Sequence, residues 1–421
     1  MKQVKLAVLG GGSSYLPELL DGVVRKWEQG EFHAESIALV DVPDGKNRME
    51  TVADFSRRMM AKRGMPCHLE TFLNRREALD GTSFVVSQIR VGGMKARWNA
   101  LRTTPASLDI ARDVLNVCPE AWLLNFSNPS GLVTEALATE ALVNHTGLKT
   151  FGLCNVPIGI KMGVAKALSA DPSRVSMDVS GLNHLSFVTG LYLDGEDVFD
   201  QVFDSPLMGA FLEAMKFAPE FGRYLRRLRV IPASYLYYYW FTERALKGQQ
   251  ENIDNGTGTR ADEVMRVEEV LFQEYEKPDS TDLPPDLKKR GGAYYSDVAL
   301  SAVSGILRNS PVDEVLNVKN GGAVPGLEPD AIVEVSCMVD GRGPRPLCQK
   351  PLPTEVLGLV QQVKAYEKLT VKAAVDGDVE TAFFALLNHP LVPGADAALA
   401  ILGDILETNR DYLPQFKGKK V

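Results

Sequence analysis

The chain has 421 residues, two to three times the usual length of one domain, so we expect more than one folded unit. Hydrophobic residues make up 45% and charged residues 24%, which is typical of a globular protein and excludes extensive disorder. No apolar run reaches the roughly eighteen residues of a membrane span, and no signal-peptide cleavage site follows MKQVKLAVLGGG. The 46 basic and 54 acidic residues give a net charge of −8, which argues against a nucleic-acid partner and favours a cytoplasmic protein.

The cysteine pattern indicates a reducing compartment. The five cysteines are scattered and odd in number, at positions 67, 118, 154, 337 and 348. They form neither a CxxC pair nor a disulfide framework. We therefore expect any functional cysteine to act as a thiolate or a metal ligand.

The first 170 residues alternate short apolar runs with helical patterns, as βαβ units around a parallel sheet do. We expect six strands, at 4–9, 37–40, 68–71, 84–87, 122–126 and 150–153. Between the first two, Leu19, Leu20, Val23, Val24 and Trp27 recur at helical spacing. The pattern predicts an α/β fold with an N-terminal doubly wound (Rossmann) parallel sheet, of the type found in lactate and malate dehydrogenases.

The remaining residues, 171–421, predict a second, mixed α+β domain. We expect strands at 175–179, 186–193 and 330–339, helices at 294–307 and 353–375, and a polar, proline-rich loop at 277–289.

The first predicted strand ends in a glycine-rich turn formed by Gly10, Gly11, Gly12, Ser13, Ser14 and Tyr15. Such a turn before a helix lets a backbone approach a pyrophosphate, although Tyr15 stands where GxGxxG has its third glycine. The second strand ends at Asp41, whose carboxylate could accept hydrogen bonds from ribose hydroxyls and would repel a 2′-phosphate. The alternatives to nucleotide binding are that the glycines only form a turn and that Asp41 only caps a helix. Together these features predict NAD binding by residues 1–170 and favour NAD over NADP.

Polar residues follow the fifth and sixth strands, where ligands bind in open α/β sheets. Asn128 follows the fifth strand, Cys154 and Asn155 follow the sixth, and His184 lies further along the chain. Cysteine, histidine and amide side chains form a soft-to-borderline set of ligands for a divalent metal. The alternatives are a buried cysteine that only packs and a structural histidine.

An aromatic run, SYLYYYW at 234–240, is explained by core packing or by one tyrosine that serves as a base. A nearby metal or cation would have to lower the pKa of that tyrosine. Arg90, Arg97 and Arg102 follow the fourth strand, and Arg260 adds a further cation.

Several motifs together resemble glycoside hydrolase family 4, the glycosidases that depend on NAD and a divalent metal, and within it the 6-phospho-β-glucosidases. They cover essentially the whole chain, in order: GGGSSYLPEL (10–19), RVGGMKAR (90–97), LLNFSNPSGLVTEA (123–136), GLCNVPIGIKMGVAK (152–166), GLNHLSFVTG (181–190), IPASYLYYY (231–239), GTRADEV (258–264), KRGGAYYSD (289–297) and LNHPLVP (387–393). Asn155 after the cysteine, together with KRGGAYYSD, resembles the β-glucoside branch.

The resemblance implies a role for individual residues. Cys154 and His184 match the metal ligands, normally of manganese, and Tyr235 matches the general base that removes the C2 proton. Asn128 matches a residue near the C2 and C3 hydroxyls, and Arg97 and Arg260 match contacts to the substrate and its phosphate. Asn155 stands where the α branch has its acid, so we expect it only to bind substrate.

The resemblance also implies a mechanism that needs no pair of carboxylates. A 6-phosphorylated β-disaccharide or β-glucoside is oxidised at C3 with hydride transfer to NAD, deprotonated at C2, and loses its aglycone. Water then adds and the hydride returns to C3. We expect residues 171–421 to carry the substrate, metal and oligomerisation surfaces of a homodimer or homotetramer, without nucleic-acid or membrane partners.

One departure from the family concerns residues 97–103. Relatives have a loop of roughly two dozen residues with an acidic side chain here, whereas Arg97-Trp98-Asn99-Ala100 runs directly into Leu101. Either the loop was left out because it is disordered, or the protein lacks it, in which case NAD and metal could bind without catalysis. The competing functions are therefore a lactate/malate-type dehydrogenase and an inactive NAD-binding regulator.

Overall fold

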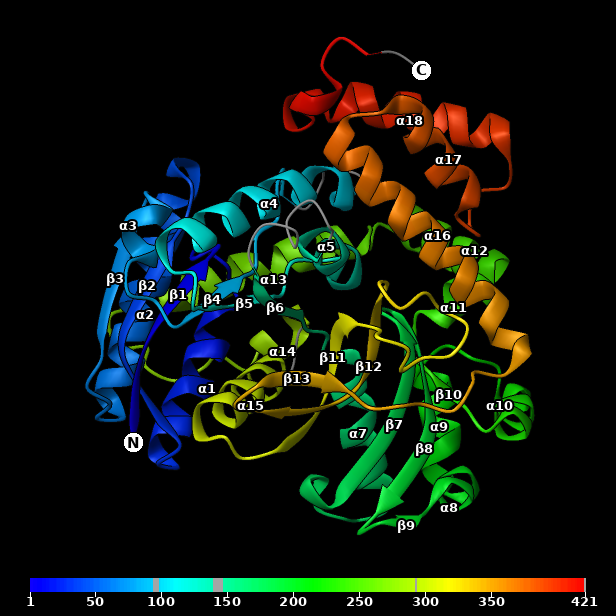
Figure 1. The fold of residues 1–421 in the computed structure, drawn as a ribbon, viewed down its shortest axis with the longest axis horizontal. Coiled ribbons are helices and arrows are strands. Elements are labelled where there is room, and N and C mark those ends of the chain that lie inside the picture. Colours follow the sequence, from blue (N-terminus) through cyan, green and yellow to red (C-terminus); the bar gives the residue numbers. More distant parts are fainter. Residues whose placement is uncertain (94–97, 139–146, 292–293, 420–421) are drawn as a thin grey trace.

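A nine-stranded sheet forms the centre of the computed structural model, which describes residues 1–93, 98–138, 147–291 and 294–419 (Figure 1). The strand order is β13-β12-β11-β6-β5-β4-β1-β2-β3. The N-terminal strands are β1 (Lys2–Leu9), β2 (Phe32–Val40), β3 (His68–Phe72), β4 (Phe84–Ser87), β5 (Trp122–Asn125) and β6 (Lys149–Gly152). These six pair in parallel, which confirms the predicted Rossmann sheet.

Helices connect the parallel strands: α1 (Leu16–Glu28), α2 (Lys46–Lys62), α3 (Arg75–Leu79), α4 (Asn99–Val117) and α5 (Ser130–Leu137). Helix α7 (Val156–Ala167) follows the last of them, β6. The predicted start of β2, at residue 37, was wrong by five residues. Polar Glu35 and Ser36 interrupt the apolar run, but pairing with β1 continues back to Phe32 through an irregularity between Val4 and Lys5. Backbone pairing therefore extends the strand beyond its apolar segment.

Three C-terminal strands extend the same sheet with antiparallel pairing. They are β11 (Val312–Lys319), β12 (Ile332–Asp340) and β13 (Gly343–Pro346), and β11 joins β6 where Asn317 faces Gly152. The predicted strand at 330–339 and helices at 294–307 and 353–375 are present as β12, α15 (Tyr295–Arg308) and α16 (Thr354–Asp376). Strands β11, β12 and β13 thus belong to the same sheet as the N-terminal strands. The domain boundary expected between residues 170 and 171 remains a prediction.

A second, antiparallel sheet contains β7 (Val175–Leu182), β8 (Leu185–Leu193), β9 (Glu196–Asp197) and β10 (Ile231–Pro232). Strand β12 packs against it: the Ser336 hydroxyl accepts the Val179 N–H at 2.9 Å and donates to the Met177 carbonyl at 2.8 Å. The following helices are α8 (Phe199–Asp204), α9 (Pro206–Ala214), α10 (Gly222–Leu228), α11 (Leu236–Trp240), α12 (Thr242–Asp254), α13 (Arg260–Tyr275) and α14 (Leu287–Arg290). The predicted polar loop lies mainly between α13 and α14.

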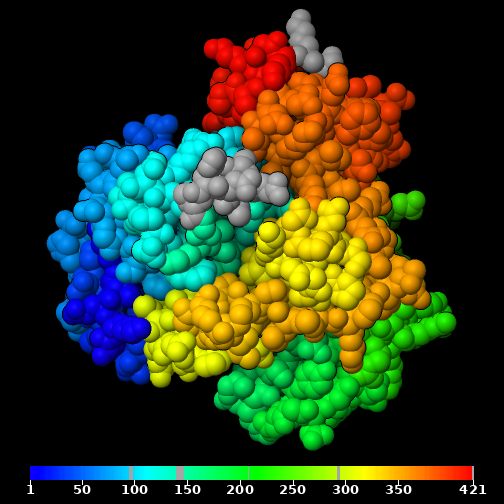
Figure 2. Space-filling view, in the orientation of Figure 1, coloured from blue at the N-terminus to red at the C-terminus, as the bar shows by residue number. Residues whose placement is uncertain are grey.

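The chain ends in a lobe at one end of the molecule, drawn in orange to red in Figure 2. Helices α17 (Val379–Asn388) and α18 (Ala395–Thr408) pack there with the C-terminal part of α16. Buried Ala382, Leu386, Leu402 and Phe416 give the lobe a separate apolar cluster. Among the described helices, none has both the length and the apolarity needed to cross a bilayer.

Candidate active site

The glycine-rich turn lies at the carboxyl edge of the parallel sheet and is held by β2. The N–H groups of Gly10 and Gly11 donate to the Val40 carbonyl at 2.9 and 2.8 Å. Gly10 has a φ of +90°, and a Cβ there would lie 2.8 Å from the Gln88 carbonyl oxygen. Only glycine fits this position without displacing the end of β4.

Asp41 stabilises this turn from the end of β2. Its Oδ2 accepts the Gly12 N–H at 2.7 Å, and its Oδ1 accepts the Val42 N–H at 2.8 Å. Asp41 does not cap a helix, so that alternative from the sequence is wrong. A carboxylate has about four acceptor sites, so Asp41 retains capacity for a ribose hydroxyl.

Ser14 is buried beyond the glycines, and Tyr15 is partly buried. Ser14 is fully buried, and its hydroxyl donates to Glu268 Oε1 at 2.9 Å and accepts from Arg290 Nε at 3.1 Å. Although burial raises the pKa of Glu268, Arg290, Ser14 and Arg48 together hold it below its usual range. The Ser13 hydroxyl accepts the Tyr15 N–H at 3.3 Å. The turn is thus tied to α13 and α14, more than 250 residues away in the chain.

The two predicted metal ligands come from different sheets. Cys154 follows β6 and is 2% exposed, and Asn155 precedes α7 directly. His184 lies in the two-residue turn between β7 and β8, where its φ of +66° belongs to the left-handed region that favours glycine or asparagine. A histidine held in such a turn is a signal of function.

Tyr235 contacts His184 and interacts electrostatically with Cys154. It directly precedes α11, and its ring stacks on the His184 ring with centroids 4.0 Å apart and planes at 5°. Burial raises the pKa of Tyr235, and the negative charge of an ionised Cys154 raises it further, whereas Arg260 lowers it. Cys154, His184 and Tyr235 therefore lie in one region, in which Cys154 is buried and Tyr235 is 37% exposed.

The electrostatics of this region suit a bound cation. Burial lowers the pKa of His184 to about 4, so the imidazole is neutral near pH 7 and can act as a ligand. Burial raises the pKa of the Cys154 thiol, and the carboxylate of Glu334 raises it further. A positive charge would reverse that increase, because thiolate is the form that binds metal.

Two buried amide oxygens bear on whether the side chains of this region could hold a metal. Asn128 Oδ1 and Asn183 Oδ1 have no hydrogen-bond partner among the described residues. The Asn183 side chain hydrogen-bonds Cys154, and the Asn128 side chain hydrogen-bonds Tyr295, whose pKa burial and Cys154 raise. The described residues contain no group of three His, Cys, Asp or Glu side chains that could hold a metal. Sulfur, nitrogen and unpaired amide oxygen nevertheless form a set that a borderline divalent metal accepts.

Tyr235 and Arg260 line one cavity of about 640 Å³ between α11, α12 and α13, together with Tyr238 and Lys216. Arg260 begins α13, pairs with Glu263 at 2.6 Å and donates to the Lys289 carbonyl at 3.1 Å. This cavity is large enough for a sugar phosphate and carries two cations. Arg97, the other predicted phosphate contact, lies outside the described residues.

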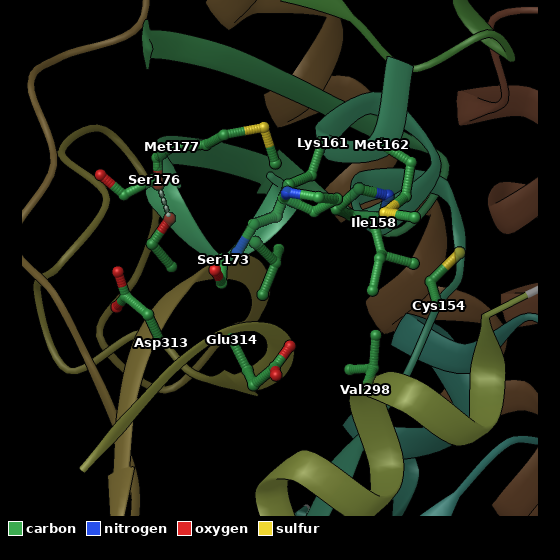
Figure 3. Close-up of a pocket in the computed structure, with 14 residues that line it drawn as sticks. Cys154, Ile158, Lys161, Met162, Ser173, Ser176, Met177, Val298, Asp313 and Glu314 are labelled. Carbon is green, nitrogen blue, oxygen red and sulfur yellow. Dashed lines mark hydrogen bonds between the residues drawn. The ribbon is translucent and has the colours of Figure 1, made fainter. Parts of the chain in front are cut away.

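Cys154 lines a second, smaller cavity, of about 160 Å³, between α7, β7, β11 and α15. Figure 3 shows Cys154 at one side of this cavity, near Ile158 and Val298 and away from Asp313. Among the described residues, none lines both cavities. Cys154 is thus absent from the lining of the cavity with Tyr235, which remains the candidate substrate site because Arg260 and Lys216 line it.

The sequence reasoning did not single out Tyr295, Asn183 or Glu334 as members of this site. Tyr295 lies in the KRGGAYYSD motif, and Asn183 is the neighbour of His184, so both could have been examined. Glu334 had one available signal, a carboxylate inside the apolar run AIVEVSCMV.

The fold and the site together define a dinucleotide-fold enzyme with a candidate metal centre. Residues 5–99 and 97–170 match the family described as "Family 4 glycosyl hydrolase", and residues 179–392 match the "Family 4 glycosyl hydrolase C-terminal domain". The chain belongs to glycosyl hydrolase family 4, a family of glycosidases.

Similar proteins agree with this assignment. The chain is 40% identical to a "Probable 6-phospho-beta-glucosidase" of Bacillus subtilis, covering 99% of both chains. It is 33% identical to the Escherichia coli 6-phospho-beta-glucosidase, covering 99% of this chain and 97% of the relative. A Thermotoga maritima 6-phospho-beta glucosidase structure with manganese, NAD+ and glucose-6-phosphate has a TM-score of 0.87 at 29% identity, covering 98% and 99%.

The likeness to dehydrogenases is limited to the fold. A Cryptosporidium parvum malate dehydrogenase is 15% identical with a TM-score of 0.53, covering 89% of this chain and 99% of that one. The predicted resemblance of fold is confirmed, whereas the family assignment excludes a lactate/malate-type dehydrogenase as the function.

Proposed function

We propose that the protein hydrolyses 6-phospho-β-glucosides with NAD and a divalent metal such as Mn²⁺. The observation that carries this proposal is the stacking of Tyr235 on His184 in the region that Cys154 shares. It supports a base and two metal ligands placed around one substrate position. Relatives named 6-phospho-beta-glucosidases support the substrate class.

Bound NAD would supply a hydride acceptor for C3 of the sugar, and bound Mn²⁺ would supply positive charge beside the C2 and C3 oxygens. Gly10, Gly11 and Gly12 would face the pyrophosphate, with Ser13, Ser14 and Tyr15 continuing the turn into α1. Asp41 would accept from the ribose hydroxyls.

The residues of the metal side have complementary roles. Cys154 and His184 would hold the metal, and the orphaned Asn128 oxygen would accept a hydrogen bond from a sugar hydroxyl. Tyr235 would remove the C2 proton, while Arg260 and Arg97 would bind the substrate phosphate and Asn155 the sugar. Lys216 adds a second cation to the described part of the cavity.

The decisive experiment is hydrolysis of a chromogenic 6-phospho-β-glucoside with NAD and Mn²⁺. We expect turnover that requires both cofactors and the 6-phosphate, with the unphosphorylated and α-linked analogues as controls. Turnover that is undiminished after removal of NAD would refute the proposal.

An inactive NAD-binding regulator remains the second candidate, because one observation favours it. The alignment with the Bacillus subtilis relative spans 450 positions, more than this chain has, and the family match divides at residues 97–99. These are the residues where the family loop is expected. NAD binding without turnover of any 6-phosphoglucoside would support this candidate.

We also propose that the protein is a cytoplasmic homodimer or homotetramer. Helices α12 and α17 expose apolar side chains, including Leu246 at 62% and Phe384 at 51%. All five cysteines are free thiols, which is consistent with a reducing compartment. Sedimentation should give a mass two or four times that of the chain, and a monomer at micromolar concentration would contradict the oligomer.

A further inference from the structure

Glu334 is a fully buried carboxylate on β12 that contacts the turn carrying His184. Its Oε1 accepts from Asn183 Nδ2 at 3.0 Å and from Asn317 Nδ2 at 3.3 Å, and its Oε2 accepts from the Ser186 hydroxyl at 2.7 Å. All three partners donate, so both carboxylate oxygens act as acceptors, and these hydrogen bonds oppose the increase in pKa that burial causes.

Two of the three donors bracket His184. Asn183 immediately precedes it, and Ser186 follows two residues later at the start of β8. His184 occupies the left-handed φ of +66°, a conformation that is uncommon for residues other than glycine and costs free energy, although histidine adopts it more often than most. The two hydrogen bonds to Glu334 therefore fix the turn at both ends of the strained residue.

The same network reaches the other predicted ligand. The Asn183 side chain that donates to Glu334 also hydrogen-bonds Cys154. Asn317, the third donor, faces Gly152 in the sheet, two residues before Cys154. A single carboxylate thus connects the segments that carry both predicted ligands.

Glu334 differs from other buried carboxylates of this chain in lacking a cation. Glu135 pairs with Lys364 at 2.7 Å, and Asp340, also on β12, pairs with Arg345 at 2.7 Å. Among the described residues, no lysine, arginine or histidine forms an ion pair with Glu334. Burial raises the pKa of Glu334, so its ionised form is costly without a positive charge nearby, and a bound cation would supply that charge.

We propose that Glu334 is a positioning residue of the metal centre: through Asn183 and Ser186 it orients His184 and Cys154, and its charge balances the divalent cation. This inference rests on the proposed function, because it takes Cys154 and His184 as the ligands. Such outer partners of metal ligands typically contribute about 10- to 100-fold in affinity.

The test measures Mn²⁺ binding by calorimetry and the unfolding temperature with and without Mn²⁺, for the wild type and Glu334→Gln. The matched control is Asp340→Asn, which makes the same carboxylate-to-amide change on the same strand away from the site. For Glu334→Gln we expect about 10- to 100-fold weaker Mn²⁺ binding, unchanged NAD affinity, and an unfolding temperature without metal equal to or above that of the wild type. A purely structural residue would instead lower that temperature and leave Mn²⁺ affinity intact.

Mn²⁺ affinity of Glu334→Gln within about threefold of the wild type, or an equal loss in Asp340→Asn, would overturn the inference. If Glu334→Gln does not fold, Ser186→Ala decides. It keeps the charge and removes one hydrogen bond, so Mn²⁺ binding should weaken by about tenfold or less, and unchanged binding overturns the inference. A wild-type protein that binds no Mn²⁺ refutes the proposed function itself, whereas equal binding by wild type and variant refutes only the role of Glu334.

Discussion

Replacing Tyr235 by phenylalanine should separate its chemistry from its packing. The ring would keep its stacking on His184 at 4.0 Å, and the lost hydroxyl has no hydrogen-bond partner among the described residues. The free energy of unfolding should therefore change by less than about 1 kcal/mol. Loss of a general base should lower kcat by about 10²- to 10⁴-fold.

Tyr235 can act as a base near neutral pH only if its pKa is lowered. Burial and Cys154 raise its pKa above the usual value near 10. For Tyr235 to act as a base near pH 7, its pKa must therefore fall by at least about three, which corresponds to about 4 kcal/mol. A unit charge about 4 Å away supplies roughly this amount at an effective dielectric constant near 20. Arg260 is exposed and paired with Glu263, so solvent screens most of its effect. The divalent cation must therefore contribute most of the shift.

The assay is kcat on the chromogenic 6-phospho-β-glucoside, with Tyr238→Phe as the matched control. Tyr238 is 38% exposed against 37% for Tyr235, and the two ring centroids are 6.0 Å apart. Because Tyr238 lines the same cavity, we expect Tyr238→Phe to lower turnover by no more than about tenfold, well short of the loss in Tyr235→Phe. The assignment of the base fails if Tyr235→Phe retains turnover, or if Tyr238→Phe loses as much.

Three further changes test other parts of the site and the fold. Asp41→Asn should reduce the preference for NAD over NADP by about tenfold or more, because it removes the charge that repels a 2′-phosphate; equal calorimetric affinities of the wild type for both would contradict this role. Cys154→Ser should weaken Mn²⁺ binding by at least about tenfold and abolish turnover, with little effect on NAD affinity; full activity without added metal would disprove it. Burial raises the pKa of Glu18 to about 7, so the folded state retains its proton longer than the unfolded chain. Glu18 should therefore lower the free energy of unfolding of the wild type as pH rises from about 4.5 to 7. In urea unfolding, Glu18→Gln should be more stable than the wild type by up to about 3 kcal/mol above that window, and the two proteins should be equally stable below it. Parallel pH profiles of the two proteins would refute the Glu18 effect.

Local pattern was sufficient to predict the parallel sheet. Apolar runs such as Val4–Leu9 and Phe84–Ser87 are buried on both faces, and glycine or polar residues end them, so strand and edge follow from the sequence. Part of the candidate site could be predicted in the same way, because Gly10, Asn128 and Cys154 follow the carboxyl ends of β1, β5 and β6. His184 and Tyr235 required the family resemblance, since neither lies at an end of that sheet.

Contacts between distant segments could not be predicted from local pattern. Strand β12 was expected, but its place beside β11 in the N-terminal sheet depends on pairing that no short-range pattern encodes. Glu268 is 254 residues from its partner Ser14, and Glu334 is 151 residues from Asn183. Such buried polar networks form only when separate elements pack, so a single sequence does not identify their partners.

The central claim is that hydrolysis proceeds by removal of the C2 proton rather than by direct displacement at C1. The most direct measurement is the reaction of a 6-phospho-β-glucoside in D₂O with NAD and Mn²⁺, followed by NMR of the glucose 6-phosphate formed. The account predicts deuterium at C2 in the product of the wild type and its loss, together with turnover, in Tyr235→Phe. A product that retains only hydrogen at C2 would contradict the mechanism.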